Sequence, residues 1–201
     1  MDCPVCHVPL DHATIMEADG ETPALSGYAC PQCEGSWVPA DTYFDWRDAL
    51  GPDAARRLPE PVPAPPDVLA NVADTPGVKR CPLDGRRMRR LHVAAEAPFS
   101  VDQCDGCNGA WFDGGEWQAV VAMGLHDRLT HVFDDAWQLQ VERTRDRDDR
   151  MDALRSVLGA DDFDETERVR AWVWAHPQRH RILGRIAEHE GDANPDAASA
   201  V

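Results

Sequence analysis

The chain has 201 residues, of which 43% are hydrophobic and 28% charged, and this composition is that of neither a disordered nor a membrane-embedded protein. Its net charge of −16 repels phosphate backbones and disfavours broad contact with nucleic acid. Seven cysteines, an odd number, fit a disulfide framework poorly, and residues 1–10 lack the basic and apolar regions of a secretory signal. Together these features predict a cytoplasmic protein.

Six of the seven cysteines form CxxC pairs, and the seventh opens the phrase CPLD, which has the same form with an acid in the last place. In chain order the residues of these four phrases are Cys3, Cys6, Cys30, Cys33, Cys81, Asp84, Cys104 and Cys107. The second pair of each half continues as CxGxW, ending at Trp37 and Trp111. The repetition predicts two similar modules.

The first module contains material for a β hairpin between its two pairs, at residues 14–17 and 25–30. Two thiolates that are two residues apart can bind one ion from a tight turn, and a hairpin brings two such turns together as a tetrahedral zinc site. We therefore predict a zinc ribbon with the ligands Cys3, Cys6, Cys30 and Cys33. His7 and His12 are expected to be surface bystanders because the cysteine set is complete.

Residues 58–67 contain five prolines, which favour an extended spacer between the modules. We predict a small metal-stabilised α+β fold of two tandem zinc ribbons with a mostly helical C-terminal region. The expected segments are ribbon one at 1–46, a short helix and proline-rich linker at 47–78, ribbon two at 79–118, a helical region at 119–190 and a disordered tail at 191–201.

The second module repeats the hairpin at residues 88–93 and 99–103 but lacks a fourth cysteine, and three candidates compete for that place. Asp84 is preferred because it stands where the turn would place a sulfur, and Gly85 permits a positive φ there. The alternatives are His92 and a water molecule. A water ligand would make a catalytic zinc, but no general-base motif such as HExxH is present, and we expect neither catalytic residues nor an enzyme.

The phrase CPxC, followed by CxxCxGxW, an Asp and a Gly-Glu pair, resembles the transcription-factor-IIB-type zinc-ribbon family of small bacterial proteins. Ribbon two matches best, with Asp113 and Glu116 after Trp111, whereas ribbon one has Pro39 and Thr42 at these places. The resemblance implies zinc-bound ribbons, about 80 residues in all. We expect Asp113 to cap a helix beginning near Gly114, with Glu116 as its capping-box partner, and the exit helix of ribbon one stays open.

Six basic residues surround the front turn of ribbon two, namely Lys79, Arg80, Arg86, Arg87, Arg89 and Arg90. They could present a strip to phosphates, but the net charge favours a solvated face that pairs with acids of the same chain.

The C-terminal third shows helical spacing of apolar residues. One predicted stripe comprises Leu125, Leu129, Val132, Phe133 and Ala136. Residues 142–150 contain no apolar side chain and indicate a solvated or frayed helix. The next helix is expected to have its cap at Asp161, Asp162 and Asp164 and to end at His176, before Pro177, and a last short helix has its apolar face at Ile182, Leu183 and Ile186.

Two tryptophans of this region are predicted to face opposite ways. Trp172 lies on a stripe with Val169, Val173 and His176, whereas Trp174 points elsewhere, so that one tryptophan stays outside the local core. Such a side chain is a candidate anchor for a protein partner.

The sequence therefore predicts a non-enzymatic protein with two Zn²⁺ ions that serves as an interaction or adaptor module, with another protein as partner and no membrane contact. The alternatives are nucleic-acid binding through the arginines and a zinc hydrolase with an open second site. The oligomeric state is not predicted.

Overall fold

The computed structural model describes residues 1–18, 20, 22–51 and 61–188. The chain divides into two compact units, residues 1–146 and 147–201.

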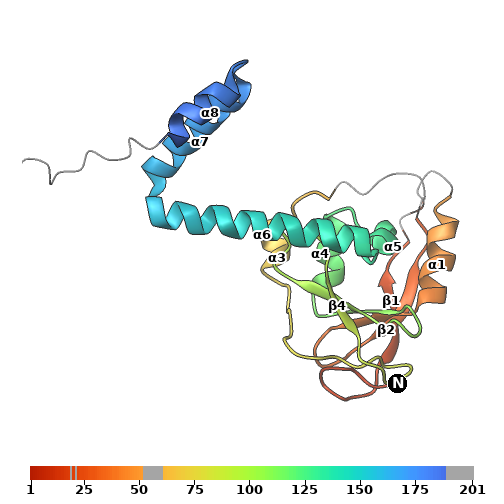
Figure 1. The fold of residues 1–201 in the computed structure, drawn as a ribbon. Helices are drawn as coiled ribbons and strands as arrows, with labels where there is room; N and C mark the ends of the chain where they lie inside the picture. Colours follow the sequence, from red (N-terminus) through yellow and green to blue (C-terminus); the bar gives the residue numbers. More distant parts are fainter. Residues whose placement is uncertain (19, 21, 52–60, 189–201) are drawn as a thin grey trace, which may run out of the picture. The chain divides into compact units, whose positions relative to one another are not determined.

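The first unit contains two copies of one arrangement, a β hairpin followed by a third strand and a helix (Figure 1). Ribbon one comprises β1 (Asp11–Met16), β2 (Leu25–Ala29), β3 (Ser36–Val38) and α1 (Ala40–Ala49). Ribbon two comprises β4 (Arg89–His92), β5 (Ser100–Gln103), β6 (Ala110–Phe112) and α4 (Glu116–Ala122). This arrangement confirms the predicted α+β fold with two ribbons. The exit helix of ribbon one forms although Pro39 replaces the expected cap, because proline readily precedes a first helical turn.

The two ribbons share one antiparallel sheet of six strands in the order β1-β2-β3-β6-β5-β4. The ribbons join at β3 and β6, where Trp37 pairs with Trp111, Ser36 with Phe112 and Val38 with Ala110. In the repeat, Ser36 and Val38 correspond to Ala110 and Phe112. The register is therefore self-complementary, and a local two-fold relation passes through the tryptophan pair.

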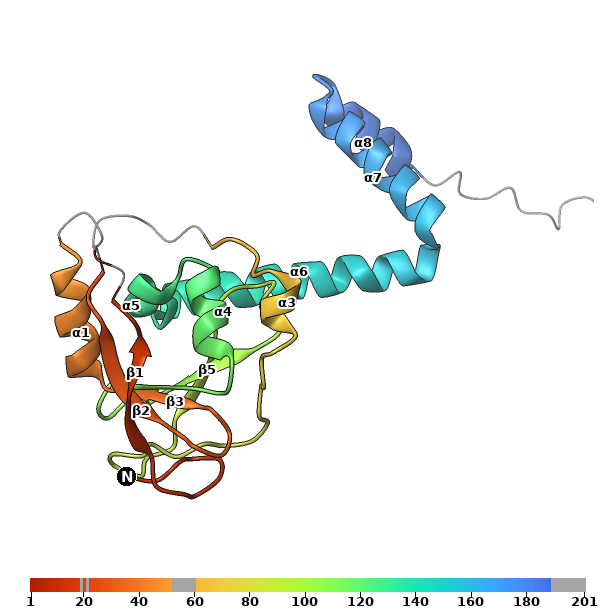
Figure 2. The same cartoon turned by 180° about the vertical axis from the view of Figure 1, so that it is seen from behind.

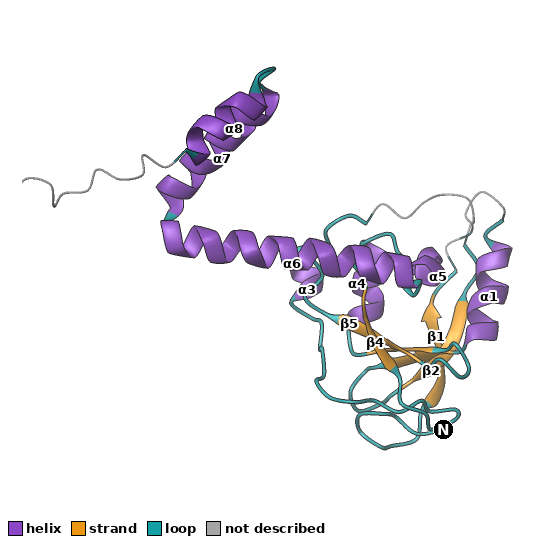
Figure 3. Ribbon diagram, viewed as in Figure 1, coloured by secondary structure: helices purple, strands orange, loops and turns teal. Residues whose placement is uncertain are grey.

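Strand alternation separates two apolar clusters. Val38 and Phe112 enter the main core, which also contains Leu25, Val101 and side chains of α1, α4 and α5 (Leu129–Val132). Trp37 and Trp111, one residue away along the strands, enter a second cluster with the cysteines of both ribbons. In the first unit the helices lie on one side of the sheet, and loops gather beyond its other side near the N-terminus (Figure 3).

Residues 61–78 pack onto ribbon two. Ala64 is buried, Val62 N donates to the Met123 carbonyl at 3.3 Å, and α3 (Pro66–Leu69) follows and contacts α4. The described part of the proline-rich segment is thus attached to the first unit, and residues 52–60 lie outside the described residues. Both ribbons and residues 61–78 belong to one compact unit, and the single division between units falls after Asp146.

The predicted stripe after residue 122 is divided among several short elements. Leu125, Leu129 and Val132 are buried as predicted, but they lie in or beside a 3-10 turn (His126–Arg128) and α5, and Ala136 is exposed. Gly124, with φ of 69°, ends the preceding helix in a left-handed conformation, so no single helix carries the stripe. The first turns of α6 (Asp135–Leu158) complete the unit, where Trp137 Nε1 donates to the Val93 carbonyl at 3.1 Å.

In the second unit, α7 (Ala160–Ala175) and α8 (Arg179–Ala187) lie side by side (Figures 1 and 2). Residues 142–150 are helical within α6, and the predicted end of α7 at His176 holds to within a residue. No side chain caps α7, whose N-cap is Gly159. Of the three predicted acids, Asp161 and Asp162 stand in the first turn, where their charge interacts favourably with the helix dipole.

The prediction that Trp172 faces the local core is wrong. Trp172 and Trp174 are 57% and 60% exposed, and Val173 between them is the one buried residue among 147–188. The helix α8 has nine residues and packs against α7. Ile182 and Leu183 are half-buried, whereas Ile186 is exposed. The predicted tail, residues 191–201, lies outside the described residues.

Candidate metal centres

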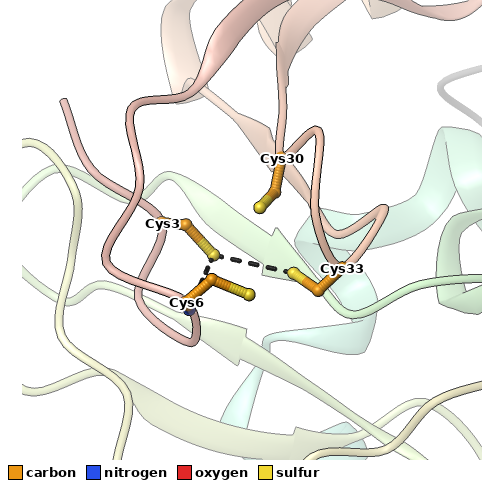
Figure 4. Close-up of side chains that lie close together, drawn as sticks. All are labelled: Cys3, Cys6, Cys30 and Cys33. Atoms are coloured by element: carbon orange, nitrogen blue, oxygen red, sulfur yellow. Dashed lines mark hydrogen bonds between the residues drawn. The ribbon is translucent and has the colours of Figure 1, made fainter.

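Four cysteines of ribbon one converge on one point (Figure 4). Cys3 and Cys6 come from the turn before β1, and Cys30 and Cys33 from the turn between β2 and β3. Their sulfurs all lie within 4.8 Å of one another, with Cys3 Sγ and Cys33 Sγ 3.6 Å apart. A tetrahedral zinc ion with Zn–S bonds of about 2.3 Å requires a separation of about 3.8 Å between sulfurs. The cluster therefore fits zinc.

The same turn geometry occurs at all four metal-binding phrases. In each, the residue after the second ligand has a positive φ and donates its N–H to the carbonyl of the first ligand. These residues are His7 (φ 59°), Glu34 (60°), Gly85 (72°) and Asn108 (57°), with N···O distances of 3.0, 3.1, 2.9 and 2.8 Å. Backbone amides also donate to the first sulfur, as Cys6 N does to Cys3 Sγ at 3.3 Å. Asp84 therefore stands at the second ligand position of a turn that has the same backbone geometry as the three cysteine turns.

Site two brings together Cys81, Asp84, Cys104 and Cys107. Cys81 Sγ lies 3.6 Å from Cys107 Sγ, and both carboxylate oxygens of Asp84 lie 3.4–3.5 Å from Cys104 Sγ. The backbone N–H of Arg86 donates to Asp84 Oδ1 at 3.0 Å and holds the pKa of this carboxyl below its ordinary value. An ionised carboxylate is the form that binds zinc, which accepts carboxylate oxygen at about 2.0–2.2 Å.

The competing histidines do not join either cluster. His92 lies on β4 with its Nδ1 3.0 Å from Ser100 Oγ, and it is outside the group of ligand atoms at site two. His7 and His12 are exposed, and the His12 ring contacts Tyr28 edge-on.

Burial raises the pKa of the Cys33 and Cys81 thiols above the ordinary value. A buried thiol has to lose its proton to bind a metal, and a divalent cation supplies the charge that makes this loss favourable. With four ligand atoms converging in each ribbon, bound zinc adds its binding free energy to the stability of the folded unit.

The tryptophans close the space between the two sites. A Cβ placed on Gly109 would lie 2.4 Å from Trp37 Cζ2, and one placed on Gly35 would lie 2.3 Å from Trp111 Cζ2. Each indole thus packs on the glycine that follows the other ribbon's last cysteine. Trp37 and Trp111 are both buried in the cysteine cluster, the place expected for side chains that shield the sulfurs from water.

Asp113 does not cap α4, whose N-cap is Gly115 in a left-handed conformation with φ of 82°. Its carboxylate instead accepts from Trp111 Nε1 at 2.7 Å and from Thr75 N at 2.6 Å. Half of the predicted capping box is present, since Asp113 N donates to Glu116 Oε2 at 2.8 Å. The buried indole N–H of Trp111 needs a hydrogen-bond acceptor, which explains why the Asp113 side chain points away from the helix.

Lys79, predicted to belong to a basic strip, is buried. Its ammonium lies 2.7 Å from Asp102 Oδ2 and 3.1 Å from Asp113 Oδ2, and it donates to the Thr75 carbonyl at 3.1 Å. These hydrogen bonds and charges outweigh desolvation and raise the pKa of Lys79, while burial raises the pKa of Asp102. The sequence held one signal for this cluster, a single lysine among twenty basic residues.

The other strip residues pair mostly with acids of the same unit. Arg90 contacts Asp74, Arg86 lies 3.8 Å from Asp84, and Arg89 lies 3.7 Å from Asp105 and 3.4 Å from Asp135.

The comparison with known families agrees with this geometry. Residues 80–123 match the family described as transcription factor zinc-finger, of the TFIIB zinc-ribbon type. The match covers all four ligand positions of site two, the tryptophan and α4, so ribbon two is similar to the zinc ribbons of that family. No curated protein and no solved structure matches the chain.

The two clusters and the family match together assign two zinc ions, one to each ribbon. Within the described residues, none of the helices has the length and apolar character needed to span a bilayer.

Proposed function

We propose that this protein is a non-enzymatic adaptor, in which two structural zinc ions hold the ribbons and the tryptophans of α7 dock another protein. The observation that carries the proposal is the exposure of Trp172 and Trp174, at 57% and 60%. Two large aromatic side chains in contact with water are costly for a folded domain, and tryptophan is enriched among the residues that dominate binding energy.

The ligand sets support a structural role for zinc. Each cluster offers four protein ligand atoms, whereas catalytic zinc keeps a position for water or substrate. Asp84 fills the fourth position at site two. Association with transcription rests on the family's name alone, and it stays a prediction that the identity of the partner tests.

The experiment is affinity capture from the native cell with metal analysis of the same sample. Trp172→Ser with Trp174→Ser should lose the captured protein, because the replaced side chains are exposed and the zinc sites lie in the other unit. Val157→Ser, at an apolar side chain that is 82% exposed in the same unit, is the matched control and should retain it. All three proteins should carry two zinc ions. Equal capture by the tryptophan variant would refute the docking surface.

The alternative proposal is that the protein binds nucleic acid instead of another protein. It has less support than the sequence suggested, because Lys79 is buried and Arg86, Arg89 and Arg90 each face a carboxylate. A gel shift at low and moderate salt separates the two proposals, since phosphate contacts weaken steeply as salt rises.

A further inference from the structure

The local two-fold relation between the ribbons defines two equivalent places on the first unit. Each lies between the exit helix of one ribbon and the rear cysteine turn of the other. On one side these are α4 and Glu34, and on the other they are α1 and Asn108. Glu34 and Asn108 occupy the same position in the repeat and share a φ near 60°.

The chain itself borders the first place, where Asp67, Val68 and Asn71 line a cavity of about 400 Å³. The backbone of residues 71–73 runs against the start of α4, where Ala73 N donates to the Gly114 carbonyl at 2.8 Å. A Cβ on Gly115 would lie 2.3 Å from the Asn71 carbonyl oxygen, so the approach is close. Val68, Leu69 and Val72 pack against the main core. A short apolar segment with one helical turn therefore packs along one side of this place.

The second place is an open cavity of about 410 Å³. Its apolar wall comprises Tyr43 and Phe44 of α1 and Leu129 and Phe133 at α5. This volume lies in the range of sites that bind small ligands or a few residues of a peptide.

The rim of the cavity is acidic. Its lining residues include three acids, Asp105, Asp134 and Asp135, and one base, Arg89, which already pairs with Asp105 and Asp135. Arg47 also lies over the ring of the lining residue Phe44 at 5.1 Å. The carboxylate of Asp135 is 91% exposed and that of Asp105 is 62% exposed, so both can accept further hydrogen bonds. The net charge of −16 on the chain reinforces attraction of a cation.

We infer that this cavity binds a short segment of a partner protein that carries apolar side chains next to basic ones, lying as residues 66–73 lie along the equivalent place. The apolar side chains fill the wall between α1 and α5, and the basic side chains meet Asp134 and Asp135. The site is separate from the tryptophan pair of α7 and adds a second docking surface to the proposed adaptor.

The test uses the full zinc-loaded chain, labelled for NMR, and a synthetic peptide with the sequence of residues 65–75 in which both aspartates, Asp67 and Asp74, are replaced by lysine. We expect saturable shift changes at Phe44, Phe133 and Asp135. The peptide with its natural aspartates should bind about tenfold more weakly, because two attractive charges become repulsive. Affinity should also fall as salt rises.

Two variants of the chain locate the site. Phe44→Ser should weaken binding about tenfold through lost apolar contact, and Asp135→Asn about threefold through lost charge. Asp148→Asn removes an exposed carboxylate elsewhere on α6 and should leave the affinity unchanged.

Three outcomes would overturn the inference, namely no saturable binding, equal binding of the two peptides, or shift changes confined to α4 and residues 71–73, which would mean displacement of the chain's own segment. The result is independent of the adaptor proposal, because Trp172→Ser with Trp174→Ser should bind the lysine peptide normally.

Discussion

Trp37 and Trp111 stand opposite each other on β3 and β6, and each indole rests on a glycine of the other ribbon. This tryptophan pair lies at the local two-fold axis between the ribbons and connects the two metal sites. The contact explains why both repeats read CxGxW, since the glycine makes room for the tryptophan of its neighbour.

Gly35→Ala and Gly109→Ala should each destabilise the first unit by about 1–3 kcal/mol. The new methyl group would meet an indole ring at 2.3 or 2.4 Å, and neither glycine has a positive φ, so steric overlap is the sole cause. Gly184→Ala on α8 meets nothing within 4 Å and serves as the control. Denaturant unfolding measures the effect, and an unchanged midpoint in both ribbon variants would refute the interlock.

The two tryptophans differ in their hydrogen bonds. Trp111 Nε1 donates to Asp113, whereas the buried Trp37 Nε1 has no partner, because Pro39 stands where Asp113 stands in ribbon two. Pro39→Asn should supply an acceptor and be more stable than Pro39→Ala by about 1 kcal/mol. The Trp37 indole N–H resonance should move in the asparagine variant alone. Equal stability and an unmoved resonance would show that the indole gains nothing there.

Glu116 makes stability depend on pH. Burial raises its pKa to about 9, so the folded chain keeps the proton while the unfolded chain releases it above about pH 4.5. The stabilisation is complete below the unfolded pKa and is lost as pH rises through the folded one, at a slope of up to about 1.4 kcal/mol per pH unit. Glu116→Gln cannot ionise. Its stability relative to the natural chain should therefore increase from about pH 5 to pH 8. Because both proteins share the zinc ligands, the difference isolates Glu116, and a constant difference would contradict its buried proton.

Asp84 makes site two the weaker zinc site, because thiolate is a softer ligand for zinc than carboxylate. Under a chelator the natural chain should release one zinc ion faster than the other. Asp84→Cys should slow the faster release about tenfold. Asp41→Cys, at an exposed residue of α1, adds a thiol outside both sites and should change neither rate. Faster release from Asp84→Cys would argue against Asp84 as a ligand.

The metal sites were accessible to sequence analysis because each depends on a local turn. Two residues between ligands fix the turn, and Gly85 correctly indicated its positive φ. The pairing of β3 with β6 could not be predicted from the sequence. Each strand has only three residues, and their pairing depends on contacts between residues far apart in the chain.

Charge and exposure were harder to predict than ligand spacing. Lys79 was predicted to belong to a basic strip because its ion-pair partners, Asp102 and Asp113, are distant in the sequence. Trp172 was predicted to lie on the same face of its helix as Val173. Helical periodicity shows which side chains share a face, but it does not show how much of that face a neighbouring helix covers, and Trp172 is exposed.

The central claim is that two zinc ions hold the first unit together, and metal analysis with NMR of the same reduced sample, before and after chelation, tests it most directly. We predict two zinc ions per chain and loss of the dispersed resonances of residues 1–146 when the chelator removes them. A reduced chain that contains no zinc and keeps the same dispersed spectrum in chelator would contradict it.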